Sequence, residues 1–139
     1  MRFLVLVRAT KETEAGILPA KELFTAMGRF NEEMARAGVM LAADGLQPSS
    51  KGAARINFDR GRRAITDGPF AETKELIAGF WIIEVRSKEE ALEWMSRAPF
   101  DSGEIELRQI YEFSDFPAEV FSPEDAARIQ SLRDELQRK

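Results

Sequence analysis

The chain has 139 residues and a formal net charge of −4, and 44% of its residues are hydrophobic, enough for a single core. It contains no Cys and no His, which excludes disulfides, thiolate nucleophiles and histidine bases and leaves a hard cation held by Asp and Glu as the only plausible metal. The acidic balance disfavours nucleic acid, and no apolar run approaches the roughly 20 residues that cross a bilayer. We therefore expect a soluble, cytoplasmic protein without a metal, a cofactor or a membrane partner.

The N-terminal third predicts a strand, a helix and a second strand. Residues 2–8 are apolar at alternating positions on both faces, which is typical of a central strand buried on both sides. A helix is expected over residues 20–37, because Pro19 suits a helix start and Gly38 suits a helix end. Its apolar face is formed by Leu23, Met27, Phe30, Met34 and Ala37. Residues 39–46 then predict the second strand.

The middle of the chain predicts a β-hairpin followed by a further strand. Residues 53–59 and 62–66 flank the dipeptide Arg60-Gly61, which is a hairpin turn signal. Residues 67–70, Asp-Gly-Pro-Phe, must end the hairpin, since Gly-Pro favours a turn and Pro offers no N–H to a strand pair. The mostly apolar residues 80–85 predict the next strand.

The second helix and the last strand complete a recognisable order of elements. Residues 87–97 predict a helix in which Ser87 and Glu90 form a capping box. Its buried face is expected to contain Ala91, Leu92, Trp94 and Met95. A strand over residues 105–111 follows. The resulting order is that of a split βαβ unit with an inserted hairpin, so we expect an α+β fold of the ferredoxin-like type.

One face of the predicted sheet has no helix to cover it. Residues 3–7 and 80–83 are apolar at every position, so alternation must turn half of these side chains away from the helices. A partner subunit is the simplest cover for that second face. We therefore expect a homodimer whose interface is built on the helix-free face.

The C-terminal residues differ in composition from the rest of the chain. We expect a domain over residues 1–111 and an extension over residues 112–139 that contains a helix beginning at Ser122-Pro123. The narrow apolar stripe of this helix comprises Ala126, Ile129, Leu132 and Leu136. Such a stripe must dock on its own chain or on a partner protein.

Several motifs of the chain resemble those of one known family. The run over residues 66–75, Thr-Asp-Gly-Pro-Phe-Ala-Glu-Thr-Lys-Glu, followed by Gly79-Phe80-Trp81, resembles the YCII-related family in its DGPF-motif subgroup, and residues 45–48 and 89–94 match the same subgroup. The resemblance implies a dimeric α+β barrel, often encoded beside extracytoplasmic-function sigma factors. Activity in the wider family has been attributed to a His and Asp pair in a cleft. This chain has no His, so only the Asp can be sought here.

Topology gathers the candidate site residues at one rim of the sheet. The ends of the first two strands meet the start of the third, which brings two polar loops and a helix N-terminus together. We expect a small polar or anionic ligand at this rim. The expected acids or bases are Asp44, Asp67 and Glu72, and the expected ligand-binding residues are Arg8, Phe70 and Lys74.

Each of these residues also has a purely structural interpretation. Asp44 and Asp67 could cap their own turns, and Phe70 could plug the core instead of walling a cleft. Glu72 and Lys74 could belong to an ordinary charged loop, and Arg8 could form an ion pair instead of clamping a ligand.

Two functions remain open on the sequence alone. The first is a small-molecule enzyme or binding protein that uses carboxylates in place of His. The second is a non-catalytic partner protein, linked to a sigma-factor circuit, with residues 113–139 as its docking element. RNA binding is disfavoured, because the central strands lack the basic and exposed aromatic residues of RNA-recognition sheets and Trp81 and Trp94 suit the core.

Overall fold

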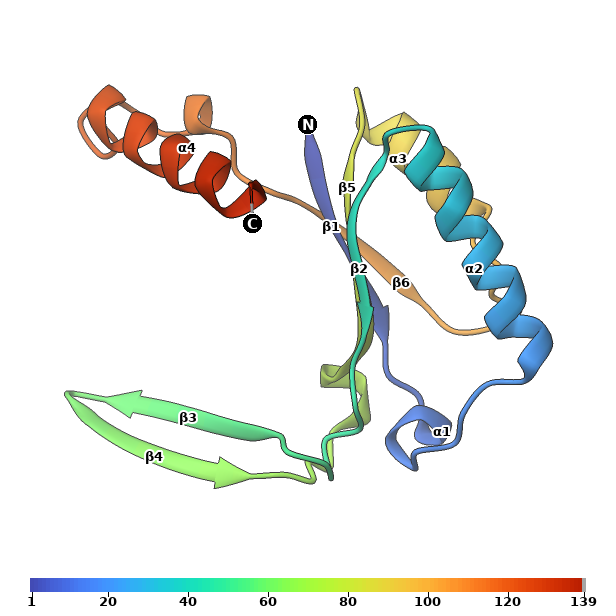
Figure 1. Ribbon diagram of the computed structural model, residues 1–139. Helices are drawn as coiled ribbons and strands as arrows, with labels where there is room; N and C mark the ends of the chain where they lie inside the picture. Colours follow the sequence, from blue (N-terminus) through green and yellow to red (C-terminus); the bar gives the residue numbers. More distant parts are fainter. Residues whose placement is uncertain (139) are drawn as a thin grey trace. The chain divides into compact units, whose positions relative to one another are not determined.

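Four strands form an antiparallel sheet at the centre of the first part of the chain (Figure 1). The computed structural model describes residues 1–138 in two units, Met1–Gln109 and a second that begins at Ile110. The sheet has the order β2-β5-β1-β6, with strands β1 (Arg2–Arg8), β2 (Met40–Gly45), β5 (Ile77–Glu84) and β6 (Ile105–Gln109). Strand β5 runs antiparallel to β1 and β2, and β6 runs antiparallel to β1. This is the split βαβ sheet, so the predicted fold class is confirmed.

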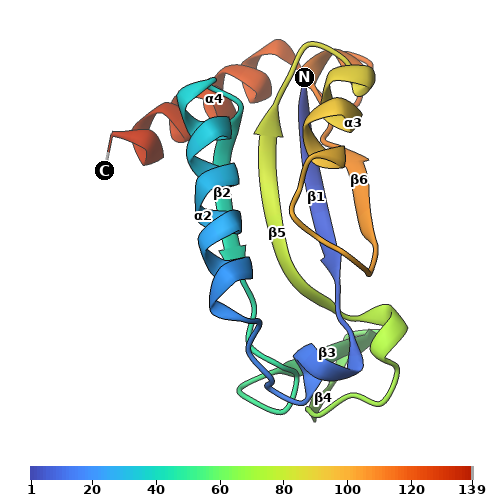
Figure 2. The same cartoon turned by 90° about the vertical axis from the view of Figure 1, so that its right-hand side faces the viewer.

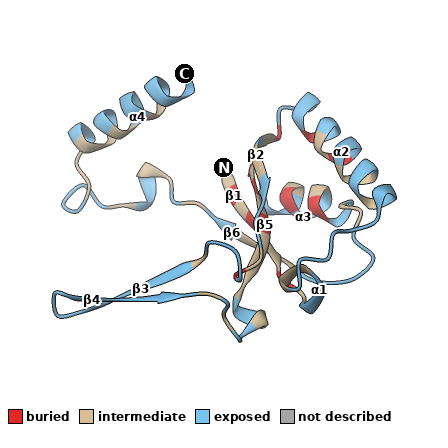
Figure 3. Cartoon of the chain, turned by 60° about the horizontal axis from the view of Figure 1, so that its bottom comes forward, coloured by how far each residue is buried: buried red, intermediate tan, exposed pale blue. Residues whose placement is uncertain are grey.

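Two helices, α2 (Lys21–Arg36) and α3 (Lys88–Ser96), cover one face of this sheet (Figure 2). Buried residues lie on the sheet and on the helix sides that face it (Figure 3). The core consists of Phe3, Val5, Phe30, Met34, Val39, Trp81, Ile83, Val85, Ala91 and Met95. Helix α2 ends before Gly38, whose φ of +73° suits glycine, as the sequence predicts.

The start of α3 differs in detail from the expected capping box. Ser87 accepts a hydrogen bond from the Glu90 N–H at 3.1 Å, but the Glu90 carboxylate accepts from the Arg86 N–H, not from Ser87. Leu92, expected in the buried face, is 45% exposed. The helix has nine residues and buries only a narrow stripe that contains Ala91 and Met95. Leu92 follows Ala91 directly, so its side chain is rotated by about 100° around the helix axis, away from that stripe.

Strand β5 begins three residues earlier than the sequence predicts. Ile77 and Gly79 already pair with the end of β1, although Gly79 carries no side chain that could signal a strand. A Cβ on Gly79 would lie 3.1 Å from the Asp44 carbonyl oxygen, so the close approach of β2 favours glycine here.

The face of the sheet away from the helices is apolar at its centre. Cross-strand register pairs Leu4 with Ile82 and Leu6 with Phe80, and directly opposed residues share a face. These four side chains alternate with core residues and are only partly buried in the single chain. The expectation of a sheet with two apolar faces therefore agrees with the register.

The predicted hairpin is present as a separate two-stranded sheet of β3 (Ala54–Asp59) and β4 (Arg62–Asp67). Its turn residues Arg60 and Gly61 have φ values of 49° and 83°. Two consecutive positive φ values are typical of the two-residue turn that matches the twist of antiparallel strands. A short helix that the sequence analysis did not predict, α1 (Lys11–Glu14), follows β1 and is capped by Thr10.

The second unit contains a turn of 3₁₀ helix at Phe113–Asp115 and the helix α4 (Pro123–Gln137). Ser122 caps α4 by accepting from the Asp125 N–H, as its sequence predicts. Strand β6 ends at Gln109 rather than at Tyr111. Gln109 pairs with Phe3, and β1 begins at Arg2, so the antiparallel partner strand offers almost no further residue for β6 to pair with. Among residues 1–138, no helix is both long and apolar enough to cross a membrane.

Candidate functional site

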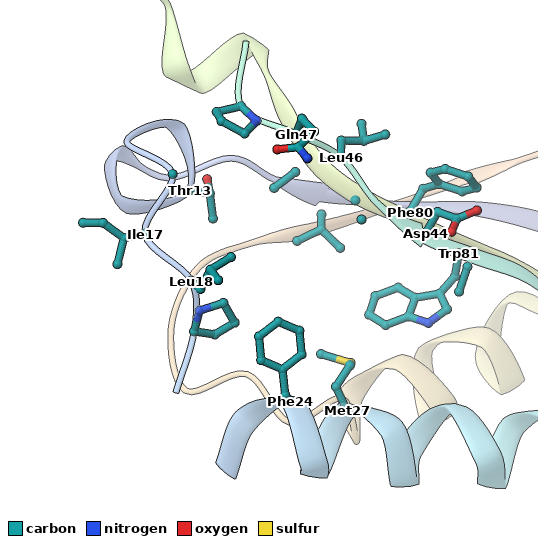
Figure 4. Close-up of a pocket in the computed structure, with 18 of the residues that line it drawn as sticks. Thr13, Ile17, Leu18, Phe24, Met27, Asp44, Leu46, Gln47, Phe80 and Trp81 are labelled. Atoms are coloured by element: carbon teal, nitrogen blue, oxygen red, sulfur yellow. The ribbon is translucent and has the colours of Figure 1, made fainter. Parts of the chain in front are cut away.

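A pocket of about 710 Å³ opens between α2, the segment before it, and strands β2 and β5 (Figure 4). It lies at the rim where the sequence predicts a site, but on the helix-covered side of the sheet. The pocket is lined by Val7, Thr13, Gly16, Ile17, Leu18, Pro19, Phe24, Met27, Asn31, Ala43, Asp44, Gly45, Leu46, Gln47, Pro48, Lys51, Ala78, Gly79, Phe80, Trp81 and Phe100.

The inner wall of the pocket is built around Trp81. This residue is 4% exposed, and its ring meets those of Phe30 and Phe100 edge-to-face at centroid distances of 6.1 and 6.2 Å. The indole N–H donates to the Asn31 side-chain oxygen at 2.8 Å. Because the Asn31 oxygen is used in this way, its amide NH₂ group is the end that remains as a donor. The inner wall is therefore rigid and aromatic, with one amide beside it.

The outer wall exposes large apolar side chains around the pocket. Ile17, Leu18 and Phe24 are 60%, 78% and 56% exposed. Figure 4 shows Leu18, Phe24 and Met27 directed towards the space in front of Trp81. Exposed apolar groups that converge on one concavity are typical of a site that gains burial when a ligand enters.

Buried Ser49 holds the loop that forms one side of the pocket. Its backbone N–H donates to the Glu14 carboxylate at 3.0 Å, and its hydroxyl donates to the other oxygen of the same carboxylate. The hydroxyl oxygen accepts the Phe70 N–H at 3.0 Å. One serine thus joins the end of α1, the loop between β2 and β3, and the Asp-Gly-Pro-Phe turn.

The Asp-Gly-Pro-Phe turn itself packs against the backbone of Ser49. A Cβ built on Gly68 would lie 1.9 Å from the Ser49 carbonyl oxygen, so only glycine fits at this position. The Gly68 N–H donates to the Ala53 carbonyl at 2.9 Å, and the Gly68–Pro69 peptide is cis. The turn therefore braces the loop over residues 46–53, which supplies Gln47, Pro48 and Lys51 to the pocket.

Four of the six site residues predicted from the sequence belong to the segment around this turn, outside the pocket lining. Asp67, the last residue of β4, is exposed, and among residues 1–138 no group donates a hydrogen bond to its carboxylate. Glu72, directly before the 3₁₀ turn Thr73–Glu75, and Lys74, within that turn, are also exposed. Phe70 is partly buried, with the Arg55 guanidinium 3.9 Å from its ring centroid.

Asp44 is the one predicted site residue that lines the pocket. Its cross-strand partner is Phe80, whereas Ala43 is paired with Trp81. Alternation therefore directs the Asp44 and Phe80 side chains to the helix-free face, opposite the Trp81 ring, as Figure 4 shows. Asp44 forms part of the sheet wall of the pocket, with its carboxylate pointing away from Trp81.

Arg8, at the end of β1, forms ion pairs with two acidic residues of the last strand region. Its guanidinium bonds to the Glu106 carboxylate and lies 3.5 Å from that of Glu104. The Arg8 hydrogen bond, followed by a weaker one from Arg108, holds the pKa of the Glu106 carboxyl below its ordinary value. Of the two interpretations open for Arg8, the ion pair is the one present.

We expect Arg8→Met to raise the pKa of Glu106 towards the ordinary glutamate value of about 4.3. A lowered pKa in the folded state stabilises the fold at neutral pH, and this contribution is lost as the pH falls through the lowered pKa. NMR titration of the Glu106 carboxyl carbon measures the shift. Arg97→Met, which removes a guanidinium stacked on Trp94, is the matched control. An unchanged Glu106 titration in Arg8→Met would contradict the ion pair.

The sequence analysis missed most of the residues that line the pocket. Of residues 17–19, the sequence analysis uses only Pro19, as the start of a helix. Phe24 lies one position outside the apolar stripe that runs from Leu23 to Met27. One signal of the pocket is available in the sequence: an apolar run stands before the helix, and an apolar residue of the helix lies off its buried stripe. Without tertiary contacts, such residues cannot be distinguished from core residues.

Two known proteins are similar to parts of this chain. The chain is 39% identical over 61 residues to an uncharacterised protein of Rhizobium meliloti (strain 1021); the match covers 42% of this chain and 49% of that protein, so the chain spans about half the length of this relative. It is also similar to the solved structure of 5-chloro-2-hydroxyhydroquinone dehydrochlorinase from Burkholderia phenoliruptrix AC1100 in complex with 2,5-dihydroxybenzoquinone, with 14% identity and a TM-score of 0.43 over 81% of this chain and 96% of that chain.

The family expected from the motifs is found by direct comparison with family profiles. The profile of the YCII-related domain matches residues 1–114, which include the whole sheet, both covering helices and the pocket. The chain belongs to the YCII-related domain family.

Proposed function

We propose that the first unit binds a small, largely apolar organic molecule in the pocket in front of Trp81. The observation that supports this most is the pocket itself, about 710 Å³ in volume and lined mainly by aliphatic and aromatic side chains. This volume is within the range of sites that enclose small molecules. The proposal adds an apolar body to the small polar or anionic ligand that is expected from the sequence.

The polar groups of the lining define where a ligand would carry its own polar atoms. The Asn31 amide lies beside Trp81 and offers N–H donors, and Gln47 and Lys51 lie on the braced loop. Lys51 is the one cationic side chain of the lining among the described residues. An ammonium at one side of an apolar pocket favours a ligand whose apolar body ends in an anionic group.

We expect 8-anilinonaphthalene-1-sulfonate, which is aromatic and anionic, to bind the folded protein at one site, with fluorescence excited through Trp81. Gly45 shares the face of Ala43 and Trp81, and a Cβ there meets no atom within 4 Å, so Gly45→Leu places a side chain in the pocket. This variant should weaken binding by at least about tenfold, because burial of the probe's rings is lost. Fluorescence titration measures the effect.

Two matched controls accompany this titration. Gly28→Leu adds the same side chain at an exposed position of α2 and should change the dissociation constant by less than about twofold. Lys51→Ala should weaken binding severalfold, whereas Lys74→Ala, outside the lining, should not. Equal binding by the parent and Gly45→Leu would show that the probe sits elsewhere and would overturn the proposal.

A second candidate function is protein binding through the C-terminal unit. Leu132 and Leu136 of α4 are 54% and 62% exposed, and Val120 is 71% exposed. Exposed leucines one helical turn apart are typical of helices that dock on a partner. This function would be favoured if a second protein copurifies with the chain, if Leu132→Glu abolishes that copurification, and if no small molecule binds in the pocket.

We also propose that the protein is a homodimer through the helix-free face of its sheet. The apolar pairs Leu4 with Ile82 and Leu6 with Phe80 lie at the centre of that face. In a two-fold dimer the same patch serves both copies, so one apolar face is enough to build the contact. Burial of these side chains would remove them from water in both subunits.

A further inference from the structure

The β3–β4 hairpin has one apolar and one polar face. Register pairs Ile56 with Ile65 and Phe58 with Arg63, and these side chains share a face. The other face contains the pairs Arg55 with Thr66, Asn57 with Ala64, and Asp59 with Arg62. The hairpin is therefore amphipathic, like a sheet that packs one side against a core.

Nothing within the first unit covers the apolar face of the hairpin. All twelve strand residues are exposed, with Ile56, Phe58 and Ile65 at 53%, 71% and 70%. Figure 3 shows the hairpin exposed over its whole length. An isolated two-stranded hairpin is at best marginally stable in water, so this apolar face needs a cover to hold its shape.

The position of the hairpin indicates where that cover comes from. It projects from the rim of the sheet on the side opposite α2 and α3, the side of the helix-free face (Figure 1). The uncovered sheet face and the hairpin thus lie on the same side of the first unit. A single partner seated on the sheet would also lie within reach of the hairpin.

The charge of the hairpin is opposite to that of the rest of the chain. Residues 54–67 carry four Arg and two Asp, a net charge of +2, whereas the remaining residues carry 16 basic and 22 acidic side chains, a net charge of −6. By register, the helix-free face of the sheet bears three acidic residues and two basic ones: Asp44, Glu84 and Glu106 against Arg2 and Arg108. A second copy of the chain is therefore electrostatically complementary to the hairpin.

The area of the sheet face also favours a contribution from the hairpin. Four strands that are about 23 Å long and spaced about 4.8 Å apart give a sheet face of roughly 440 Å². A stable interface buries roughly 800 Å² of surface on each partner. The two hairpin strands add roughly 200 Å². The sheet face alone is small for a stable dimer, and the hairpin extends it by almost half.

We propose that the hairpin is a dimerisation arm whose apolar face, with Ile56, Phe58 and Ile65, packs against a second copy of this chain. The inference rests on the proposed homodimer and adds that the arm is part of its interface. Arg63, beside Phe58 on the packed face, then meets acidic side chains of the other copy.

Single-cysteine probes test the arm directly, because the chain has no Cys of its own. Ile65→Cys places a thiol on the apolar face, and Ala64→Cys, the adjacent residue, places one on the polar face. We expect alkylation of Ile65→Cys to slow by at least about tenfold between nanomolar and high micromolar protein. The rate for Ala64→Cys should change by less than about twofold. Sedimentation of the same samples reports the oligomeric state, and circular dichroism reports the fold.

A second pair of variants keeps the test independent of cysteine chemistry. Phe58→Glu should raise the dimer dissociation constant by at least about tenfold, and Asn57→Glu, on the polar face, should leave it within about threefold. If Phe58→Glu leaves the dimer dissociation constant unchanged, the hairpin is not part of the interface, and only the dimer through the sheet face is retained. A monomer at all concentrations would overturn both. Protection of Ile65→Cys in samples that sediment as monomers would show that the arm is covered within one chain, which also overturns the proposal.

Discussion

Gly68→Ala is expected to lower the free energy of unfolding by about 3 kcal/mol, among the largest effects of any single methyl group in this protein. The added Cβ would meet the carbonyl oxygen of Ser49 at 1.9 Å and its carbonyl carbon at 2.9 Å. Both are backbone atoms, so no side chain can rotate away, and one of the two loops must move. Urea denaturation followed by Trp fluorescence measures the change.

The same substitution should weaken binding of the anilinonaphthalene probe. A shift of the loop that contains Ser49 also moves Gln47 and Lys51, which line the pocket. Gly28→Ala is the matched control: nothing lies within 4 Å of its Cβ position in the exposed part of α2, and alanine there should stabilise the helix by up to about 1 kcal/mol. A Gly68→Ala protein as stable as the parent would contradict the packing of the turn on Ser49.

Ser49→Ala is expected to cost about 2 kcal/mol of folding free energy. The buried hydroxyl links the Glu14 carboxylate to the Phe70 N–H, both partly buried. Its loss leaves the Phe70 N–H without this acceptor and removes one of the two hydrogen bonds that Ser49 donates to Glu14. Removing one member of a buried hydrogen-bonded set costs the desolvation of the groups that remain. Thermal and urea denaturation of the variant measure this cost.

Ser50→Ala serves as the control for the serine network. Ser50 is the next residue in the same loop but is exposed, so its substitution should change stability by less than about 0.5 kcal/mol. Glu14→Gln retains an oxygen acceptor and should cost less than Ser49→Ala. Equal, small effects of Ser49→Ala and Ser50→Ala would show that the network does not hold the loop.

The strand order and the two covering helices could be predicted because local patterns specify them. Alternation at residues 3–7 marks a central strand, and the spacing from Leu23 to Met34 marks one helical face. Helix ends were predicted to within about one residue, because Gly38 and Ser87 act on the backbone beside them. The hairpin followed from Arg60-Gly61 for the same reason: two adjacent residues contain the whole signal.

The role of the Asp-Gly-Pro-Phe run could be predicted only in part. Its turn chemistry follows from the residues themselves, but the partner of the turn is Ser49, about twenty residues earlier in the chain. The sequence analysis put weight on the charge of Asp67, whereas the contacts involve Gly68 and the Phe70 N–H. A glycine required by the approach of a distant backbone atom looks the same in the sequence as one required by its own turn.

The side of the sheet on which the pocket opens was decided by tertiary structure. The sequence predicts the rim, because strand directions determine which loops share an end of the sheet. The side of the sheet on which a cavity opens depends on how far the segment before α2 stands from Trp81, and no local pattern encodes that separation. Ile17, Leu18 and Phe24 are apolar in the sequence and would suit a core equally well; only packing leaves them exposed around an open volume. The sequence by itself therefore determined the elements and their order, and the long-range contacts between loops determined the site.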